Sequence, residues 1–377
     1  MKKKVFTVIV IGFHLRLFIA VWNSFWGPSI GAEVDAASFH YWASEFSRQP
    51  TLDNLKISST YSYMLGVFYY LTTDSLFIGS FLSCLVWLVS CVFLIKIMGL
   101  ISITEYNKFK VMLIYALLPS SIFFTSVTLR EVYQLLFINM AAYYALKIFL
   151  KKSVSQWVFL LFSVVGMGVL HGALLVFGIL ISGATLGLQT LSSHRRFSLI
   201  KFSLVAILIF AILLYGLSST SGVFYTFDDG IDVAIENYQQ GSLELDGRTN
   251  YKGTVEINGL VDLILFFPVS LIQYLFEPMP WRMSSIIDLL TLFENILRAW
   301  LIWKAWINMK SSNTQKRRLV ILIFIMYIVL ESIWSIGTIN WGTAIRHHLP
   351  SFGLLLVTAF AYPVNKFDSQ TKVAMQK

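Results

Sequence analysis

Early in the chain, a carboxylate stands just ahead of a stretch with helical character. Asp35 precedes residues 36–43, and Asp is a frequent helix N-cap, so the pattern predicts a helix that begins at Ala36 and is capped by Asp35. If it faces an external cavity, such a carboxylate can accept a proton from a sugar hydroxyl. The alternative is that Asp35 only caps the helix while Phe39 and Trp42 sit at a membrane interface. Two candidate substrate-binding residues flank it, Glu33 and His40.

A second candidate is the adjacent pair Arg130 and Glu131, which follows a stretch that begins at Pro119. A guanidinium is well suited to a phosphate or pyrophosphate because it offers several N–H donors in one plane. In this interpretation Glu131 orients Arg130. The alternative is a solvated helix start, in which Glu131 simply favours the positive end of the helix dipole.

A third candidate brings Arg346, His347 and His348 together at the predicted start of the last helix. Three potential cations without a neighbouring acid in the sequence indicate an anionic ligand, and anchoring to lipid headgroups is the alternative. No metal site is expected here, because adjacent helical residues point in different directions and no HxxxH or carboxylate spacing accompanies them. We therefore assign no metal ion or cofactor from the sequence.

Two chain breaks supply further candidates. Pro278 and Pro280 interrupt an apolar stretch, and Trp281 beside them could stack on a sugar ring or act as an ordinary interfacial tryptophan. Three further residues are assigned to substrate binding or to the same cavity: Glu277, Arg282, and His171, which marks a break between two short helices. Four charged residues lie within apolar stretches and are expected to form structural ion pairs: Arg16, Glu294, Arg298 and Glu331. Glu294 and Arg298 are one helical turn apart on the same face of their helix.

The composition limits the class of protein that can position these residues. Of the 377 residues, 56% are hydrophobic, 16% are aromatic and only 13% are charged, against about 25% charged residues in soluble proteins. Mean hydropathy is +0.70. These values exclude a soluble enzyme, a disordered chain and a disulfide scaffold, and they predict an all-α polytopic transmembrane bundle. The chain is expected to form one domain over residues 1–377.

Ten apolar segments are long enough to span a membrane, and two shorter aromatic segments are expected to lie at the interface or to re-enter. The predicted spans are 5–26, 78–101, 110–124, 131–150, 157–170, 172–188, 197–217, 283–307, 319–336 and 349–361, and the two interfacial segments are 61–71 and 260–276.

The basic residues indicate the orientation of this bundle. With both termini in the cytoplasm, 20 of the 29 Lys and Arg residues lie on the cytoplasmic side and seven lie outside, as the positive-inside rule requires. The formal charge of +9 therefore reflects orientation, and no nucleic-acid partner is expected. Long external loops are predicted at about 27–60 and 218–259. The candidate residues Asp35, Arg130, His171 and Arg346 then share the external face.

Several mechanisms lack their sequence motifs. The chain has no Walker A motif, which excludes an ATP-driven pump, and it has no GxSxG, HExxH or CxxC motif.

Taken in order, these features resemble the GT-C superfamily of membrane glycosyltransferases, in particular the bacterial protein-mannosyltransferase-like members of surface polysaccharide synthesis. The features are Arg16 in the first helix with Asp35 and Phe39-His40-Tyr41 in the first loop, the Pro119 to Arg130-Glu131 stretch, the Pro278 to Trp281 break before Glu294, and the run from Asn340 to Arg346. Members of this superfamily often carry an adjacent pair of acids in the first loop, whereas here Val34 separates Glu33 from Asp35.

The resemblance implies transfer of a glycosyl unit from a polyprenyl-phosphate donor to an acceptor, outside the bacterial inner membrane. Asp35 would be the general base, Arg130 and Arg346 would stabilise the departing phosphate, and Glu131 would complete the catalytic set. The chain also resembles Wzy-type polysaccharide polymerases, which use polyprenyl-pyrophosphate-linked substrates. A flippase or transporter of lipid-linked glycans is a third possibility, in which no bond is made.

Overall fold

The computed structural model describes residues 2–28, 33–50, 57–151, 155–191, 248–251, 260–309 and 314–362, and these residues are helical apart from short connections. Within these ranges the only β pairing is an isolated bridge between Asn250 and Asn340. The helices are α1 (Lys2–Phe25), α2 (Glu33–Arg48), α3 (Ile57–Leu71), α4 (Leu76–Leu100), α5 (Glu105–Leu117), α6 (Pro119–Phe124), α7 (Glu131–Lys151), α8 (Ser155–Leu170), α9 (Gly172–Leu191), α13 (Leu260–Phe276), the 3₁₀ turn η1 (Pro280–Arg282), α14 (Ile286–Asn308), α15 (Thr314–Gly337), α16 (Trp341–His347) and α17 (Leu349–Ala359).

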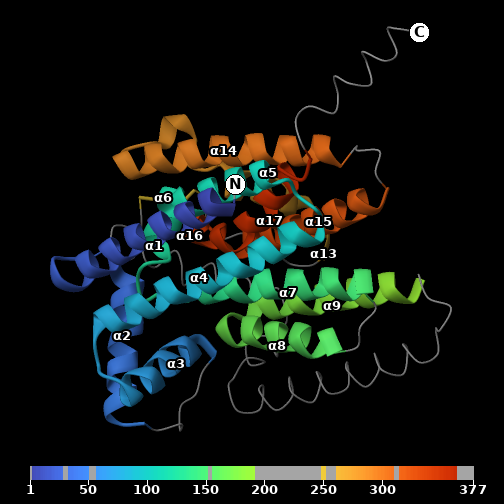
Figure 1. Ribbon diagram of the computed structural model, residues 1–377. Helices are drawn as coiled ribbons and strands as arrows, with labels where there is room; N and C mark the ends of the chain where they lie inside the picture. The colour runs from blue at the N-terminus through green and yellow to red at the C-terminus, as the bar shows by residue number, and fades with distance from the viewer. Residues whose placement is uncertain are drawn as a thin grey trace, which may run out of the picture.

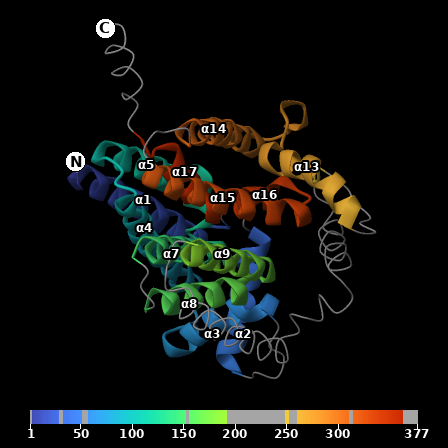
Figure 2. The ribbon, with the colours of Figure 1, turned by 90° about the vertical axis from the view of Figure 1, so that its right-hand side faces the viewer.

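Most of the long helices run in similar directions and pack in layers, as Figure 1 shows. The helices α13 and α14 form one edge and pack on α15 and α17, which in turn contact α7. Next to α7 lie α8 and α9, and α3 contacts α8. The helices α2 and α3 pack mainly on each other at the edge opposite α14, as a second view confirms (Figure 2).

Four of these helices are long and apolar enough to cross a membrane by length and composition, which indicates a membrane protein. They are α1, α4, residues Glu131–Leu150 of α7, and Lys316–Gly337 of α15. Shorter apolar helices of 10–17 residues surround them. The structure therefore confirms an all-helical chain with apolar spans, while the ten-span count goes beyond it. The predicted span 197–217 lies outside the described residues.

The distribution of side chains on α14 is the reverse of that on a helix in a soluble protein. Its buried positions are mostly polar and include Asp288, Glu294 and Arg298, whereas large apolar side chains such as Phe293 and Trp303 are exposed. A soluble protein rarely exposes a continuous apolar face of this kind. This arrangement is expected of a helix that turns its apolar face to lipid and its polar face to the bundle.

Three predicted boundaries need correction. The segment 110–124 does not form one helix, because the chain breaks at Leu118 before Pro119 and forms the separate helices α5 and α6. A proline lacks the N–H that would continue the helix, and it is favoured at the first turn of the next one. The helix predicted from Ala36 begins at Glu33, so Asp35 lies in its first turn and is not its cap. The interfacial segment 61–71 extends from Ile57 as α3, whereas 260–276 matches α13.

The break between α5 and α6 leaves backbone groups that two buried charged side chains satisfy. The Arg16 guanidinium donates to the carbonyl oxygen of Ala116 at 2.9 Å, at the end of α5. The backbone N–H of Ser120, in α6, donates to Glu294 Oε1 at 2.9 Å. Each charge also has the favourable sign for the helix dipole, with the cation at a C-terminus and the carboxylate at an N-terminus.

Arg16 is completely buried, with an exposure of 0%, and it bonds to neutral oxygens. Nε donates to Thr125 Oγ1 at 2.7 Å, and Nη2 donates to Ser121 Oγ at 2.8 Å. The guanidinium lies 3.7 Å from the centroid of the Trp87 ring, which adds a cation–π contact. A glycine at position 12 allows α1 to lie close to α5, because a Cβ on Gly12 would lie only 2.9 Å from the Cβ of Ala116.

The carbonyl oxygens at the end of α13 likewise accept hydrogen bonds from side chains of α14. Arg298 Nη1 donates to the carbonyl oxygen of Leu275 at 3.0 Å, and Asn295 Nδ2 donates to that of Glu277 at 2.8 Å. Among the described residues, the expectation of structural ion pairs is therefore wrong for Arg16, Glu294 and Arg298, whereas Glu331 pairs with His348. Arg16, Glu294 and Arg298 instead bond to the polar backbone at helix ends, which the sequence spacing did not show.

Candidate functional site

The polar site forms where α2 meets α16, and it brings together residues 311 positions apart. Arg346 Nη1 donates to Asp35 Oδ2 in a short ion pair. The Arg346 side chain is 13% exposed and that of Asp35 is 47% exposed, so the pair lies at the edge of the bundle and the carboxylate is its more accessible member. The structure thus joins two of the four predicted catalytic residues.

Arg130 enters the same region from the turn between α6 and α7. Its guanidinium lies 5.7 Å from the centroid of the Phe39 ring, one helical turn after Asp35 on α2. Two residues earlier, the Thr128 hydroxyl donates to the carbonyl oxygen of Ala36 at 2.8 Å. These contacts fix the start of α2 against the turn that carries Arg130, so two arginines and one carboxylate approach each other.

Trp334 contacts two histidines beside the arginines, His347 face to face and His171 edge to face. The ring of Trp334 lies 3.9 Å from that of His347 and 4.4 Å from that of His171, measured between centroids. His347 Nδ1 is 3.1 Å from Thr338 Oγ1. The backbone N–H of Ala173 donates to His171 Nδ1 at 3.2 Å, so that nitrogen carries no proton.

Burial and nearby positive charge keep both histidines neutral. Burial lowers the pKa of His171 well below its usual value, and the charge of Arg130 lowers it further. Burial also lowers the pKa of His347, and the neighbouring His171 and the charges of Arg346 and Arg130 lower it further. The positive charge of this site therefore resides on the two arginines.

Glu131 lies apart from Arg130, although the two residues are adjacent in the sequence. Its side chain is buried, and Oε2 has no hydrogen-bond partner. Among the described ion pairs none joins Glu131 to Arg130, so the structure gives no support to the predicted orienting role.

His348 also lies outside the region around Asp35 and Arg346. Its Nδ1 is 2.5 Å from Glu331 Oε2, and its Nε2 is 3.1 Å from the carbonyl oxygen of Tyr274 near the end of α13. A carbonyl only accepts, so Nε2 carries a proton. The Ser351 hydroxyl bonds to the other oxygen of Glu331. His348 thus belongs with the side chains that satisfy helix ends.

The predicted residues Trp281 and Arg282 lie in η1, in a second polar cluster. Trp281 is 78% exposed, which suits an interfacial tryptophan. Arg282 Nη1 lies 3.6 Å from Glu277 Oε1 and donates to the carbonyl oxygen of Tyr251 at 3.1 Å. Among the described residues, no contact joins Trp281 or Arg282 to the Asp35–Arg346 pair.

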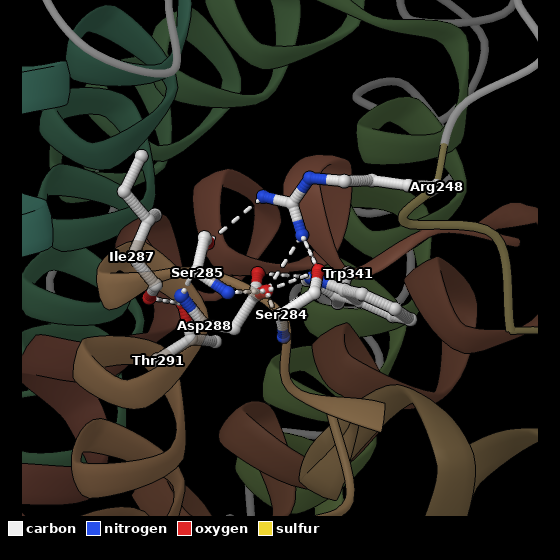
Figure 3. Close-up of polar contacts among 7 residues, drawn as sticks. All are labelled: Arg248, Ser284, Ser285, Ile287, Asp288, Thr291 and Trp341. Carbon is white, nitrogen blue, oxygen red and sulfur yellow. Dashed lines mark hydrogen bonds and ion pairs between the residues drawn. The ribbon is translucent and has the colours of Figure 1, made fainter. Parts of the chain in front are cut away.

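The second cluster centres on Asp288, at the start of α14 (Figure 3). Arg248 Nη1 donates to Asp288 Oδ2 at 2.6 Å, and Trp341 Nε1 donates to Asp288 Oδ1 at 3.1 Å. Ser285 and Asp288 also form a capping box, in which each side chain accepts from the backbone N–H of the other residue. This cluster connects the start of α14 to the first residue of α16.

The segment 248–251 holds the start of α16 in place. The backbone N–H of Trp341 donates to the carbonyl oxygen of Thr249 at 3.1 Å, and that of Tyr251 donates to Ile339 at 3.0 Å. Asn340 caps α16 by accepting from the N–H of Thr343 at 2.7 Å. Because Arg346 lies in the last turn of this short helix, these bonds also determine where its guanidinium lies.

The two remaining candidates lie on α2. His40 Nδ1 is 2.9 Å from the Tyr69 hydroxyl, so His40 faces α3, and burial lowers its pKa. Glu33 is the first residue of α2, and its side chain is outside the described part. Of the eleven predicted site residues, the structure gathers a smaller set around one position: Asp35, Arg130, His171, Arg346 and His347.

Sequence reasoning did not identify Trp334, Arg248 or Asp288. Trp334 looks like one more apolar residue of a span, and nothing in its spacing shows that it contacts two histidines. Asp288 did carry a signal, because Ser285 three residues earlier forms the start of a capping-box pattern. Arg248 lies in a polar loop without a periodic pattern.

Comparison with known proteins adds no assignment to this geometry. The chain matches no protein-family model and no curated protein.

Proposed function

We propose that this protein is an integral membrane glycosyltransferase, which moves a glycosyl unit from a polyprenyl-phosphate-linked donor to an acceptor. The observation that carries the proposal is the meeting of Asp35 and Arg346 across 311 residues, with Arg130 beside them. A carboxylate supplies a proton acceptor, and two guanidiniums supply binding sites for a phosphate. The resemblance to GT-C enzymes in the order of the same residues supports it.

The reaction assigns each charged group a distinct task. The acceptor hydroxyl oxygen forms a bond to the anomeric carbon of the sugar while the bond from that carbon to the phosphate oxygen breaks. The hydroxyl proton passes to Asp35, and the bonding electron pair leaves with the polyprenyl phosphate. Arg130 and Arg346 stabilise the charge that develops on the phosphate. Neutral His171 and His347 add hydrogen-bonding capacity without adding charge.

The orientation that we propose places both termini in the cytoplasm and the site outside the bacterial inner membrane. It is supported by the asymmetry of 20 basic residues on one side against seven on the other. Ser38 is exposed on α2, one helical turn from Asp35, and therefore serves as a reporter. We expect Ser38→Cys to react with an impermeant thiol reagent in intact cells, whereas protection of this residue would overturn the orientation.

A Wzy-type polymerase is the second candidate, because the structure has a second group of arginines. A polymerase holds two lipid-linked substrates, and Arg248 and Arg282 lie near exposed Trp281 at η1. However, Arg248 is paired with Asp288 and Arg282 with Glu277. The carboxylates of Asp288 and Glu277 are 1% and 4% exposed, whereas that of Asp35 is 47% exposed, so a ligand would displace them less easily. The second group is therefore less suited to a second pyrophosphate, and we favour the transferase.

A transporter is the third candidate, since the broken helix α5–α6 is a feature of many transporters. In transporters the free helix ends bind the substrate or the coupling ion. Here Arg16 and Glu294 already satisfy the ends at the break. A structural role for this break leaves the Asp35–Arg346 region as the better candidate for binding.

The decisive experiment uses the purified full-length protein in detergent with radiolabelled polyprenyl-phosphate sugars. Transfer of label to a saccharide acceptor, or slow release of free sugar to water, is expected of the parent protein. The Asp35→Asn variant should lose this activity while it remains folded. Transport of a lipid-linked glycan in proteoliposomes without any bond cleavage would instead support the third candidate.

A further inference from the structure

The ion pair between Asp35 and Arg346 poses a problem for the proposed reaction. Asp35 Oδ2 accepts from Arg346 Nη1, yet the reaction requires the same two groups to serve different substrates. Arg346 must hold the donor phosphate, and the carboxylate must meet the acceptor hydroxyl. The pair in the structure therefore describes a resting arrangement that has to open.

The two partners differ in how easily each can leave. Arg346 is 13% exposed and lies on α16, which is fixed at its start by Asn340, Trp341 and the segment 248–251. Asp35 is 47% exposed and lies in the first turn of α2, a helix that packs mainly on α3 at the edge of the bundle. A rotation of the Asp35 side chain toward solvent can thus open the pair without moving α16.

A phosphate is a stronger partner for these arginines than the carboxylate. It carries more negative charge and presents more acceptor oxygens, which the planar guanidinium can bind in a bidentate manner. A phosphate can also reach Arg130, whose guanidinium lies over Phe39, one turn along α2 from Asp35. Because His347 and His171 are neutral, no histidine cation competes for it.

We propose that Asp35 is the built-in counter-ion of Arg346 at rest and that the phosphate of the lipid-linked substrate displaces it. The freed carboxylate then becomes available to the acceptor hydroxyl. The identity of the ligand as a lipid-linked phosphate rests on the proposed function, whereas the exchange of one anion for another rests on the ion pair itself. Binding of the donor and availability of the base become coupled.

The direct test measures the reactivity of Asp35 in the parent protein. Purified full-length protein in detergent is treated with a water-soluble carbodiimide and glycinamide, with and without saturating farnesyl phosphate, and the labelled peptides are quantified by mass spectrometry. Labelling of Asp35 is expected to rise several-fold when the probe binds. Glu45, on the same helix and paired with Arg48, is the internal control and should not change.

A second test compares the affinity of variants for the same probe by calorimetry. Removing the competing charge in Asp35→Asn should tighten binding of farnesyl phosphate roughly two- to fivefold, the range expected for an ion pair that is partly exposed. Glu45→Gln removes a carboxylate from the same helix and should leave the affinity unchanged. Arg346→Gln should weaken binding about tenfold or more.

Inorganic phosphate in a parallel experiment distinguishes the two sources of the same chemistry. If it also displaces Asp35, the site recognises the phosphate group alone, and if only farnesyl phosphate does so, the lipid chain contributes. If a phosphate displaces Asp35, labelling of Asp35 must increase with at least one of the two probes. Unchanged labelling of Asp35 at saturation, or unchanged or weaker binding in Asp35→Asn, overturns the proposal.

The outcomes separate this inference from the proposed function. Increased labelling and tighter binding without any glycosyl transfer by the parent protein would retain the exchange of anions and remove the transferase. Glycosyl transfer without any change in Asp35 labelling would retain the transferase and remove the exchange.

Discussion

Two groups of charged side chains in this protein, one around the α5–α6 break and one between α2 and α16, differ in what their charges bind. At the break, Arg16 is fully buried and donates to hydroxyl and carbonyl oxygens, and Glu294 accepts from a backbone N–H. Between α2 and α16, Arg346 binds the partly exposed carboxylate of Asp35. The first group has fixed neutral partners within the fold, whereas the second has a charged partner whose carboxylate is half-exposed.

Charged residues in the helices of this protein have two different roles. An intramembrane charge is a functional candidate by default because burying it is costly. Arg16 and Glu294 show the exception, in which the charge satisfies a helix end that a proline has opened. The turn 125–130 connects the two groups, since Thr125 accepts from Arg16 and Arg130 lies at the site. The charged residues at the α5–α6 break therefore support the turn that carries Arg130.

The largest effect is expected from removing the charge at the break. Arg16→Met retains most of the side-chain volume but leaves the carbonyl of Ala116 and the hydroxyls of Thr125 and Ser121 without their donor. Each buried polar group that loses its partner costs about 1–3 kcal/mol, so we expect a loss of at least about 3 kcal/mol and little folded protein. Size-exclusion chromatography and thermal unfolding in detergent measure this loss.

The matched control for Arg16 is Arg48→Met, on the surface of α2. Arg48 is exposed and pairs with Glu45 and Asp74 at 3.3 Å, so its removal should change stability by less than about 1 kcal/mol. If Arg16→Met matched Arg48→Met in yield and unfolding temperature, the structural interpretation of the buried group would fail.

The next effect concerns activity and not stability. Asp35→Asn keeps the shape of the side chain but removes the proton acceptor, and loss of a general base costs about 10²–10⁴ in rate. The unfolding temperature should stay close to that of the parent, because the residue is half-exposed. Transfer from a polyprenyl-phosphate sugar is the measurement, with Glu45→Gln as the control. Full transfer by well-folded Asp35→Asn would remove Asp35 from the mechanism.

The elements and the site differ in how far the sequence predicted them. The helices at 78–101, 131–150 and 319–336 were predicted within a few residues, because long apolar runs have few alternatives in a membrane. The break at Pro119 was missed as an end of a helix, although the proline was noted. Both of its flanks are apolar, and a composition window averages over the interruption.

The site shows what local patterns can and cannot supply. The residue types at Asp35, Arg130 and Arg346 indicated proton acceptance and anion binding, and the ion pair brings two of them together. The roles of Arg16, Glu294 and Arg298 depend on contacts between helices that are distant in the sequence, and the i,i+4 spacing of Glu294 and Arg298 suggested a wrong partner. Glu131 shows the same limit, since adjacency to Arg130 did not determine where its carboxylate points.

A smaller effect is expected at Glu294, where one atom carries the contact to the break. Glu294→Gln retains an oxygen that accepts from the N–H of Ser120, so we expect a loss of only about 1 kcal/mol. Glu294→Leu removes the acceptor and should lose about 2–3 kcal/mol, because the N–H is then buried without a partner. Thermal unfolding compares the two variants. An equal loss in both would show that the charge, and not the acceptor, stabilises the break.

The smallest effect is a dependence of stability on pH that arises from His347, next to Arg346. Burial, followed by the neighbouring His171 and the charges of Arg346 and Arg130, lowers the pKa of His347 in the folded protein. The unfolded chain, with a histidine pKa of about 6.5, therefore binds a proton that the folded protein does not. Stability must then rise with pH through this window, and acidification below about pH 6.5 lowers it.

His347→Gln tests this sign, because Gln is neutral at every pH and can still bond to Thr338 Oγ1, which lies 3.1 Å from His347 Nδ1. We expect the unfolding temperature of the parent to fall between about pH 8 and pH 5 more steeply than that of the variant. His14→Gln, on the exposed side of α1, is the control and should retain the slope of the parent. Parallel curves for the parent and His347→Gln would mean that the pKa of His347 is not lowered in the folded protein. Binding of a phosphate should flatten the parent curve in part, because the anion offsets the contribution of the two arginines while that of burial remains, and no charge at the α5–α6 break offers such a response.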